Sequence, residues 1–484
     1  MDVNAYTQED KKRIDCLLGE ETGKNRRKIV VLDDDPTGTQ TVHDVPVYTK
    51  WDQESIEAGF RDESNIFFVL TNSRGLTEQE TAALHTCIAK GICSAGERTG
   101  RDYILISRSD STLRGHYPLE TKVLKETIEK RSKTVMDGEV ICPFFEEGGR
   151  YTRDNIHYVA YGDQWVRASD TEFAKDSAFG FKNSDLRLYI EEKTKGEYKE
   201  EDVVSISLGE LRGLKISLIA EKLKAVTDFN KVIVNATDYY DLKVFCISLY
   251  RAMAEGKRFL FRTAASFVKV AAGIQERPLL TRSEMIHTDS QNGGIIIIGS
   301  YTDKTTKQLK ELETCRGVEC IEFNSDLVMD RDDFNKEVER VSKLCSRLIS
   351  QGKTAAVYTK RKKFTGGSRS GEETLLCSVR ISEGITSIAG RLDTVPLFVL
   401  AKGGITSSDV ATKALGQVRS VVMGQILPGI PVWKTGNESR YPGIPYIVFP
   451  GNVGEEDSLR QAAERLLGYY DEGQGMECSE HDMP

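Results

Sequence analysis

The stretch at residues 28–47, KIVVLDDDPTGTQTVHDVPV, decides how the first half of the chain is interpreted. Its apolar residues 29–32 predict a buried strand, which ends in three adjacent carboxylates, Asp33, Asp34 and Asp35, and a Pro-Thr-Gly turn. Like charges beside a buried strand cost folding energy unless cations or hydrogen-bond donors face them. Ligands of open α/β sheets bind at the carboxyl ends of the strands, so this position suits a polyol, a metal or a phosphate. A solvated turn would have the same pattern.

The bulk composition indicates a globular protein with a core in each of two or three domains, since the chain has 484 residues, 39% hydrophobic and 29% charged. The polar N-terminus lacks an apolar core of signal-peptide length, and no apolar run approaches the roughly 18 residues of a membrane span, so we expect a cytoplasmic protein that contacts no membrane. A net charge of −8 argues against nucleic-acid binding. The ten cysteines lack zinc-ligand spacing and are interpreted as reduced core thiols. Any bound metal would be Mg²⁺, with its protein ligands unknown.

Strand-like and helical segments alternate along the chain. In the first half, strands are expected at residues 66–70, 103–107, 139–142, 203–206, 232–235 and 259–261, and helices at 77–91, 118–131 and 240–255. In the second half, strands at 295–298, 355–358, 397–401, 420–423 and 446–449 precede a helix at 456–469. This alternation predicts an α/β protein with mainly parallel sheets flanked by helices.

A polar linker at residues 287–294, HTDSQNGG, separates the two series. We therefore expect an N-terminal lead-in (1–27) with an amphipathic helix, two α/β domains (28–286 and 287–470) and a flexible tail (471–484). A ligand cleft is expected between the two domains. The charged segment at residues 191–202, EEKTKGEYKEED, has no apolar face and predicts an exposed loop.

A second stretch, YILISRSDSTLRGHY at residues 103–117, also runs from an apolar strand into polar residues. Arg108 and Arg114 present planar guanidinium groups that suit bidentate bonding to a carboxylate or phosphate. Asp110 would neutralise one of them or accept a hydrogen bond from a sugar hydroxyl. The alternative is an internal Asp–Arg ion pair that braces the loop. Residues 141–153, ICPFFEEGGRYTR, repeat the pattern with charge and glycine after a strand.

Three glycine-bearing loops follow apolar strands in the second half, at residues 299–302, 402–409 and 449–454. The middle loop, KGGITSSD, leads into a helix expected at 410–415, where free backbone N–H groups favour phosphate and Lys402 would add a positive charge. Together the loops could line a nucleotide pocket, although each alone also fits a capped strand-to-helix turn. Neither GxxxxGK[ST] nor GxGxxG occurs, which argues against a P-loop NTPase and a standard dinucleotide fold.

In this order, the motifs resemble the four-carbon acid sugar kinase family, once a family of unknown function, which phosphorylates tetronates and 3-oxo-tetronates with ATP. The most specific match is DSTLRG at residues 110–115, similar to the family's KxDSTLRG. DDPTG at 34–38 is similar to DDLTG, and the segment from Cys142-Pro143 to Gly149-Arg150 to CPAFPxxGR. Gly299-Ser300 with Thr305 and Gln308, residues 403–406 and residues 451–454 (GNVG) are similar to the motifs of its C-terminal half. The resemblance runs from about residue 28 to about residue 467.

The resemblance implies an N-terminal domain for the acid sugar, a C-terminal domain for the nucleotide, ATP and Mg²⁺ as cofactors, and a homodimer as a frequent assembly. It implies that Asp34 and Asp35 contact substrate hydroxyls, and that Arg114 with Ser111 holds the carboxylate; Arg108 is a further substrate-binding candidate. The residues that would surround ATP are Ser300, Gly403, Gly404, Ile405, Thr406 and Gly451. As catalytic base we expect Asp35 or Asp110, the carboxylates best placed to accept the proton of the attacking hydroxyl.

Two departures from the family pattern matter. Ile405 stands where the family usually has Asp or Glu, and Arg108 replaces a lysine. The leading hypothesis is an ATP-dependent kinase of a small sugar acid in carbohydrate-acid catabolism. The alternatives are a non-catalytic protein that binds sugar acid and nucleotide, which Ile405 favours, a kinase for a different acidic sugar, and another α/β transferase with an anionic substrate. The stereochemistry of the acid and the phosphorylated position are left open.

Overall fold

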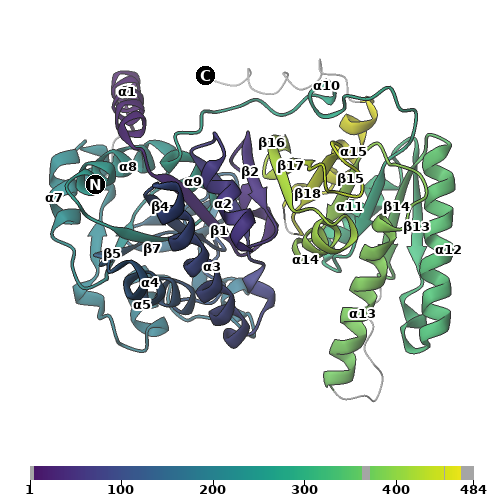
Figure 1. Ribbon diagram of the computed structural model, residues 1–484, viewed down its shortest axis with the longest axis horizontal. Coiled ribbons are helices and arrows are strands. Elements are labelled where there is room, and N and C mark those ends of the chain that lie inside the picture. The colour runs from purple at the N-terminus through teal and green to yellow at the C-terminus, as the bar shows by residue number, and fades with distance from the viewer. Residues whose placement is uncertain (1–4, 362–370, 452, 470–484) are drawn as a thin grey trace. The chain divides into compact units, whose positions relative to one another are not determined.

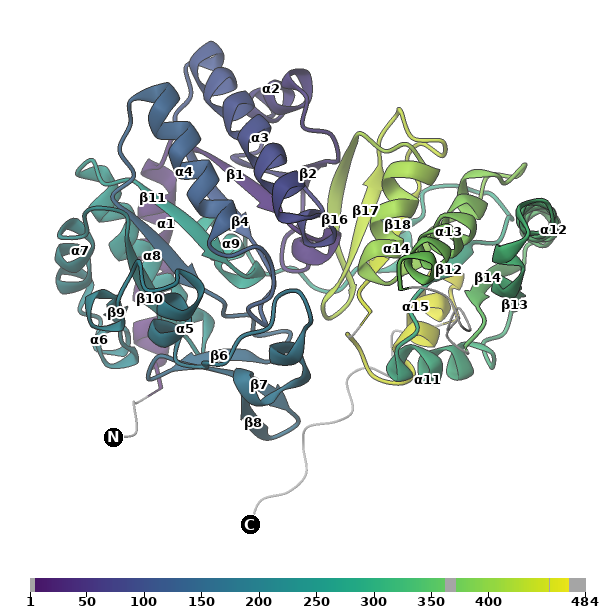
Figure 2. The same cartoon turned by 90° about the horizontal axis from the view of Figure 1, so that it is seen from below.

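The computed structural model describes residues 5–361, 371–451 and 453–469, and only the backbone of residues 371–375. Asn452 and the expected tail at 471–484 lie outside the described residues. The chain divides into two compact units, which are Met1–Arg277 with Val418–Val422, and Pro278–Gln417 with Met423–Pro484. Both are mixed α/β, with largely parallel sheets flanked by helices (Figures 1 and 2), which confirms the predicted fold class.

Unit 1 is built on a sheet of strand order β2-β3-β1-β4-β11-β5-β10-β9, in which every neighbouring pair is parallel. Its strands are β1 Lys28–Asp33, β2 Val45–Tyr48, β3 Ile66–Leu70, β4 Tyr103–Arg108, β5 Gly138–Cys142, β9 Val204–Ile206, β10 Asn230–Val234 and β11 Phe259–Thr263. Its helices are α1 Gln8–Lys24, α2 Gln53–Arg61, α3 Glu78–Thr99, α4 Leu119–Ser132, α5 Leu186–Lys193, α6 Leu208–Arg212, α7 Ile216–Lys224, α8 Tyr239–Ala254 and α9 Ala265–Ala271.

Strand β1 lies inside this sheet. All six of its residues are buried, as expected for a parallel strand covered on both faces. On one face, Val30 and Leu32 join a cluster with Phe60 of α2, Ile88 of α3 and Leu124 of α4. This packing fixes the end of β1, and therefore the position of the three carboxylates that follow.

Helix α1 is the expected lead-in helix. A capping box at Thr7 and Asp10 begins it, and it buries Ile14 and Leu18. It lies beside α8 (Figure 1), where the Lys243 ammonium is 2.6 Å from the Asp15 carboxylate.

A small antiparallel sheet, β6 Arg150–Arg153, β7 Ile156–Tyr161 and β8 Gln164–Arg167, was not predicted from the sequence. Its short strands carry polar residues at most positions and bury few side chains. Tyr151 and Trp165 stack across it with ring centroids 4.5 Å apart. The predicted loop at residues 191–202 is mostly correct, but α5 extends into it as far as Lys193.

Strand β2 has neighbours on both sides. On one side it pairs in parallel with β3, and on the other it pairs antiparallel with residues 419–422, from Arg419 opposite Tyr48 to Val422 opposite Val45. The N–H of Asp44 donates to the carbonyl of Val422 at 2.7 Å. Unit 1 is thus completed by a segment from late in the sequence.

Unit 2 has the strand order β13-β14-β12-β15-β18-β17-β16, parallel from β13 to β18, with β17 antiparallel to β18. Its strands are β12 Ile295–Ile298, β13 Val318–Phe323, β14 Thr354–Thr359, β15 Val399–Lys402, β16 Arg419–Leu427, β17 Ile430–Thr435 and β18 Pro445–Phe449, β16 beginning in unit 1. Its helices are α10 Arg282–Met285, α11 Asp303–Leu312, α12 Arg331–Ser350, α13 Gly371–Gly390, α14 Gly404–Asp409 and α15 Ser458–Leu467.

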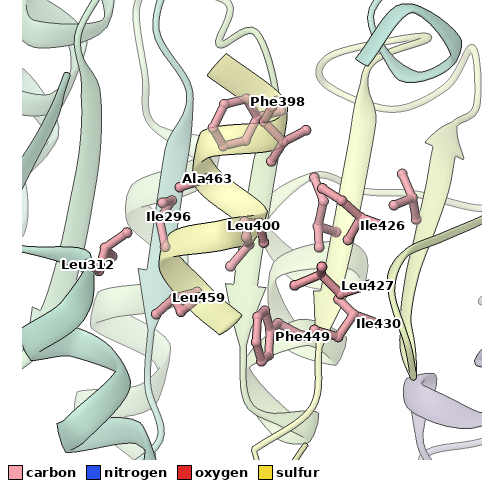
Figure 3. Packing of buried hydrophobic residues seen from close by; sticks show 14 of the residues in the cluster. Ile296, Leu312, Phe398, Leu400, Ile426, Leu427, Ile430, Phe449, Leu459 and Ala463 are labelled. Carbon is pink, nitrogen blue, oxygen red and sulfur yellow. The ribbon is translucent and has the colours of Figure 1, made fainter. Parts of the chain in front are cut away.

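The core of unit 2 supports the glycine loops. Ile296 of β12, Leu400 of β15 and Phe449 of β18 pack with Leu459 and Ala463 of α15 (Figure 3). The last residues of these strands are paired with one another, so the loops that follow begin side by side on well-packed strands. The helix expected at 410–415 begins earlier, at Gly404, and continues as a π-helix over Val410–Ala414.

Two further expectations concern the whole chain. The described cysteines are free thiols and most are buried, as predicted. Among the described residues, no helix is both long and apolar enough to cross a membrane.

Candidate functional site

The carboxyl ends of four parallel strands define one edge of the unit 1 sheet. The register places Asp33 of β1 opposite Leu70 of β3 and Arg108 of β4, and Thr263 of β11 opposite Arg108. The loops after these strands therefore begin side by side, as the positions of the polar motifs predicted.

Two arginines face the three adjacent carboxylates. Arg108 Nη1 donates to Asp34 Oδ1 at 3.0 Å, and its Nε lies 3.3 Å from Asp33 Oδ1 without a well-aligned hydrogen bond. Arg74 Nη2 donates to Asp34 Oδ1 at 2.7 Å, and its Nη1 to Asp35 Oδ2 at 3.4 Å. The cations that the acidic run requires are present, and the solvated-turn alternative does not describe this site.

Arg74 was not identified from the sequence. It lies in the 3₁₀ turn Ser73–Gly75, immediately after β3, so it obeys the same strand-end pattern as the residues that were identified. Applying that pattern to every predicted strand would have found it.

The surroundings shift the pKa values of Asp33 and Asp35 in opposite directions. Burial raises the pKa of Asp33 to about 8, against the attraction of Arg108. Burial also raises the pKa of Asp35, but Arg74 and Arg108 outweigh it and hold that pKa below its usual value. The loop after the acids packs tightly on this pair, since a Cβ on Gly38 would lie 2.2 Å from both Arg108 Nε and Asp33 Oδ1.

The DSTLRG loop is closed by an internal ion pair. Arg114 Nε donates to Asp110 Oδ2 at 2.7 Å, and the Thr112 hydroxyl donates to the same oxygen. Although burial raises the pKa of Asp110, the charges of Arg74 and Arg114 lower it far more. The bracing ion pair considered from the sequence is therefore present, and Ser111 lies in the same loop.

A second buried ion pair, between Arg262 and Glu120, also contacts the DSTLRG loop. Arg262 of β11 donates through Nη1 to Glu120 Oε2 at 3.0 Å and through Nη2 to the carbonyl of Arg114 at 3.2 Å. Glu120 also accepts from the Ser73 hydroxyl at 2.6 Å. Arg262 could not be identified from the sequence, because it lies within a buried strand rather than after one.

The small antiparallel sheet holds the other side of the loop. His157 Nε2 donates to the carbonyl of Ser111 at 2.8 Å, which leaves Nδ1 to accept from the Thr152 hydroxyl at 3.0 Å. Burial lowers the pKa of His157 to about 4, so it is neutral at neutral pH. The Phe173 ring lies against two guanidinium groups, with its centroid 5.0 Å from Arg114 Cζ and 5.8 Å from Arg150 Cζ.

In unit 2 the three glycine loops converge, as the sequence suggested. A Cβ on Gly299 would lie 2.2 Å from Thr406 Oγ1, and a Cβ on Gly451 would lie 3.7 Å from Ser300 Oγ and 4.0 Å from Gly403 Cα. Thr305 Oγ1 donates to Ser300 Oγ at 3.0 Å, which joins the first loop to α11. The predicted residues Ser300, Gly403, Thr406 and Gly451 are thus together, with Gly404 and Ile405 in the first turn of α14.

The role predicted for Lys402 is wrong. Its side chain is fully buried, and its Nζ donates to the carbonyls of Pro450 at 2.6 Å and Gly451 at 3.3 Å. Burial lowers the pKa of Lys402 well below its ordinary value. It therefore holds the third loop in place and does not offer a charge to phosphate. The sequence does not reveal this because the last residue of a strand can point into the core.

Arg361, which follows β14, was also missed. Its Nη1 donates to the carbonyl of Ser300 at 2.7 Å, and its Nη2 to the Thr306 hydroxyl at 2.8 Å. Arg361 thereby fixes the shape of the first glycine loop. Ile405, by contrast, is 70% exposed.

No cluster of three or more His, Cys, Asp or Glu side chains with metal-binding geometry occurs among the described residues. Mg²⁺ prefers to keep several waters and to bind through one or two carboxylates and the phosphates of a nucleotide. This manner of binding does not require a three-residue cluster, so the described residues are compatible with it.

The fold and the two loop clusters define a class of two-domain α/β proteins with a polar, arginine-rich site in one unit and a glycine-rich site in the other. Two domain-family models match this chain, the sugar-binding N-terminal domain over residues 29–271 and the nucleotide-binding C-terminal domain over residues 295–459. The chain belongs to the family that carries these sugar-binding and nucleotide-binding domains.

Solved structures agree in fold. A Haemophilus influenzae protein of the DUF1537 family matches with a TM-score of 0.60 and 16% identity, covering 90% of this chain and 100% of its own. A Salmonella typhimurium LT2 protein, provisionally named a tRNA synthase, matches with a TM-score of 0.66 and 13% identity over 90% of this chain and 98% of its own. A Bordetella bronchiseptica DUF1537 protein, crystallised with citrate as a domain-swapped dimer, has 18% identity and a TM-score of only 0.38, covering 91% of this chain and 98% of its own. A search of curated proteins found no match.

Proposed function

We propose that the protein is an ATP-dependent kinase that phosphorylates a hydroxyl of a small sugar acid of the tetronate or 3-oxo-tetronate class. The observation that carries this proposal is the presence of a sugar-binding and a nucleotide-binding domain in one chain. The polar loops at the strand ends of each unit support it, because carboxylates and arginines suit a hydroxylated acid and glycine loops suit phosphates.

In this proposal, the hydroxyl groups of the substrate bind at Asp34 and Asp35. Both carboxylates already accept hydrogen bonds from arginine, so they are fixed in position before a ligand arrives. Arg108 donates to Asp34 and orients its carboxylate. In this proposal Ser111 and Arg114, on the DSTLRG loop, complete the substrate site. ATP, as its Mg²⁺ complex, binds at the loops that carry Ser300, Gly403, Gly404, Ile405, Thr406 and Gly451.

The transfer step forms a bond between the substrate hydroxyl oxygen and the γ-phosphorus and breaks the bond between that phosphorus and the β–γ bridging oxygen, releasing ADP. We favour Asp35 over Asp110 as the acceptor of the hydroxyl proton. Asp110 Oδ2 accepts from both Arg114 and Thr112, whereas Asp35 accepts from the Thr37 N–H through Oδ1 at 2.9 Å and from Arg74 through Oδ2 at the longer distance of 3.4 Å. The lowered pKa keeps Asp35 ionised, and so able to accept, at neutral pH.

The test is ADP release from ATP and Mg²⁺ across a panel of D- and L-threonate, erythronate, their 3-oxo forms, and five- and six-carbon acids. Release with one acid is expected, with a loss of at least about a hundredfold in Asp35→Asn, the usual contribution of a positioned base. Asp163→Asn, an exposed residue of the turn between β7 and β8, is the matched control and should keep full activity. Silence with every acid would contradict the kinase proposal.

One observation favours a second candidate, a protein that binds sugar acid and nucleotide without turnover. Ile405 is exposed at the start of α14, where a carboxylate would be available to Mg²⁺ or to the nucleotide. ATP binding by calorimetry without ADP release, followed by a gain of release in Ile405→Asp, would support this candidate over the first.

A further inference from the structure

Arg150 is the first residue of β6 and lies in the site described above without a partner. Its Nε is fully buried and makes no hydrogen bond. Among the described residues, its guanidinium forms no ion pair within 4 Å and no side-chain hydrogen bond. Burial lowers the pKa of Arg150, which shows how poorly its charge is compensated.

The other arginines of the site are already committed. Arg108 and Arg74 are held by the three adjacent carboxylates, Arg262 by Glu120, and Arg114 by Asp110 at 2.7 Å, with Asp176 a further 3.8 Å contact. The charges that act on Arg150 from nearby are those of Asp110, Arg114 and Glu172. Arg150 is therefore the arginine of this site that forms no direct ion pair with an acid among the described residues.

Arg150 is held rigidly by its surroundings. The N–H of Phe145 donates to its carbonyl at 3.0 Å, and its own N–H donates back to Phe145 at 2.8 Å. Its guanidinium lies over the ring of Phe173, the ring that also supports Arg114. The strand itself is tied to the DSTLRG loop through Thr152 and His157. The guanidinium of Arg150 therefore lies beside the loop, and no acceptor among the described residues takes a hydrogen bond from its buried Nε.

We propose that Arg150, rather than Arg114, supplies the free positive charge that binds the carboxylate of the substrate, and that it makes the site selective for sugar acids over uncharged polyols. This inference rests on the proposed sugar-acid substrate and names the residue that recognises its acid group. Arg114 then serves mainly to position the loop, because Asp110 compensates its charge through the bond to Nε, although its Nη atoms can still donate hydrogen bonds.

The experiment is calorimetric titration of the full chain with D- and L-threonate and D- and L-erythronate, and with the uncharged polyols threitol and erythritol. Three variants are compared, namely Arg150→Gln, Arg150→Lys and Arg153→Gln. The last is the matched control, since Arg153 lies on the same strand with its side chain 51% exposed and its nearest acid, Asp154, 3.6 Å away. Unfolding by urea establishes that each variant is folded.

Arg150→Gln is expected to weaken acid binding at least about tenfold, the contribution of one charge-assisted hydrogen bond, and to leave polyol binding unchanged. Arg150→Lys should recover part of the affinity, and Arg153→Gln should behave as the wild type. A merely structural role would weaken acid and polyol alike.

The outcomes separate this inference from the kinase proposal. Acid binding that depends on Arg150 without any ADP release supports the inference and overturns the kinase. ADP release whose KM for the acid is unchanged in Arg150→Gln overturns the inference and leaves the kinase intact. Loss of acid selectivity in Arg114→Gln but not in Arg150→Gln also overturns the inference. If no acid binds the wild type, both are overturned.

Discussion

Removal of Arg108 should be among the most costly single changes in unit 1. Its side chain is 5% exposed and faces Asp34 at 3.0 Å and Asp33 at 3.3 Å. Breaking a buried ion pair by deleting one partner typically costs about 3–5 kcal/mol, because the other charge is left buried. Arg74 still holds Asp34 in Arg108→Met, so we expect the lower end, about 3 kcal/mol.

The size of this loss should depend on pH. Burial raises the pKa values of Asp33 and Asp34, and Arg108 lowers both, so removing Arg108 raises them further. A carboxyl group whose folded-state pKa exceeds its unfolded value costs stability once the pH is above the unfolded value. The deficit of Arg108→Met should therefore grow as the pH rises through the folded-state pKa of the wild type, about 8 for Asp33, and should be smaller below it.

The assay is urea unfolding followed by circular dichroism, fitted with a separate transition for each unit. Arg61→Met is the control, since its side chain is 62% exposed and pairs with Glu57 one helical turn away, an interaction of about 0.5 kcal/mol or less. In Arg108→Met with Asp33→Asn, part of the loss should return, because Asp33 is the acid that loses its arginine whereas Asp34 keeps Arg74. A deficit no larger than that of Arg61→Met, or one unchanged between pH 6 and pH 9, would refute the reasoning.

Two other predictions follow from single contacts. Gly299→Ala should weaken ATP binding, because the new Cβ would lie 2.2 Å from Thr406 Oγ1 and force the loops apart at a cost of roughly 1–3 kcal/mol. ATP affinity would be measured by calorimetry, with Gly23→Ala as the control because nothing lies within 4 Å of a Cβ there. His157 should make the protein less stable in acid, since its pKa is about 4 when folded and near 6.5 when unfolded, so the unfolded state binds more protons between these values. Roughly 2 kcal/mol should be lost between pH 7 and pH 5, measured by urea unfolding, and an equal pH dependence in His157→Gln would be inconsistent with this origin.

Much of unit 1 and its site could be predicted from the sequence, because apolar strands followed by polar residues are easy to recognise. Uniformly apolar runs such as Ile66–Leu70 are recognisable as buried parallel strands, and the polar residues that follow them must share one edge. The need for cations beside Asp33, Asp34 and Asp35 also followed from the sequence. Their partner Arg74 was missed although it follows β3 by the same strand-end pattern, and only the pairing itself, between residues far apart in the chain, required the structure.

Other features depend on tertiary context that no local pattern carries. Arg262 pairs with Glu120 inside the protein, and Lys402 turns inward to carbonyl groups, although a lysine after a strand normally suggests exposure. The strands of the β6 to β8 sheet are short and mostly polar, so the alternation of apolar and polar residues that predicts a strand is weak in them. In unit 2, convergence of the glycine loops was predictable because β12, β15 and β18 are apolar and parallel.

The late segment that completes unit 1 has a consequence for how the protein is made. Strand β2 lies at the end of the N-terminal parallel sheet, and its outer backbone groups are paired only by residues 419–422. During synthesis, that edge stays open until Val422 has left the ribosome, long after Arg277 has emerged. An unpaired strand edge is a template for aggregation. We therefore expect the nascent chain to need protection by chaperones through most of its translation, and a chain shortened to residues 1–277 to precipitate.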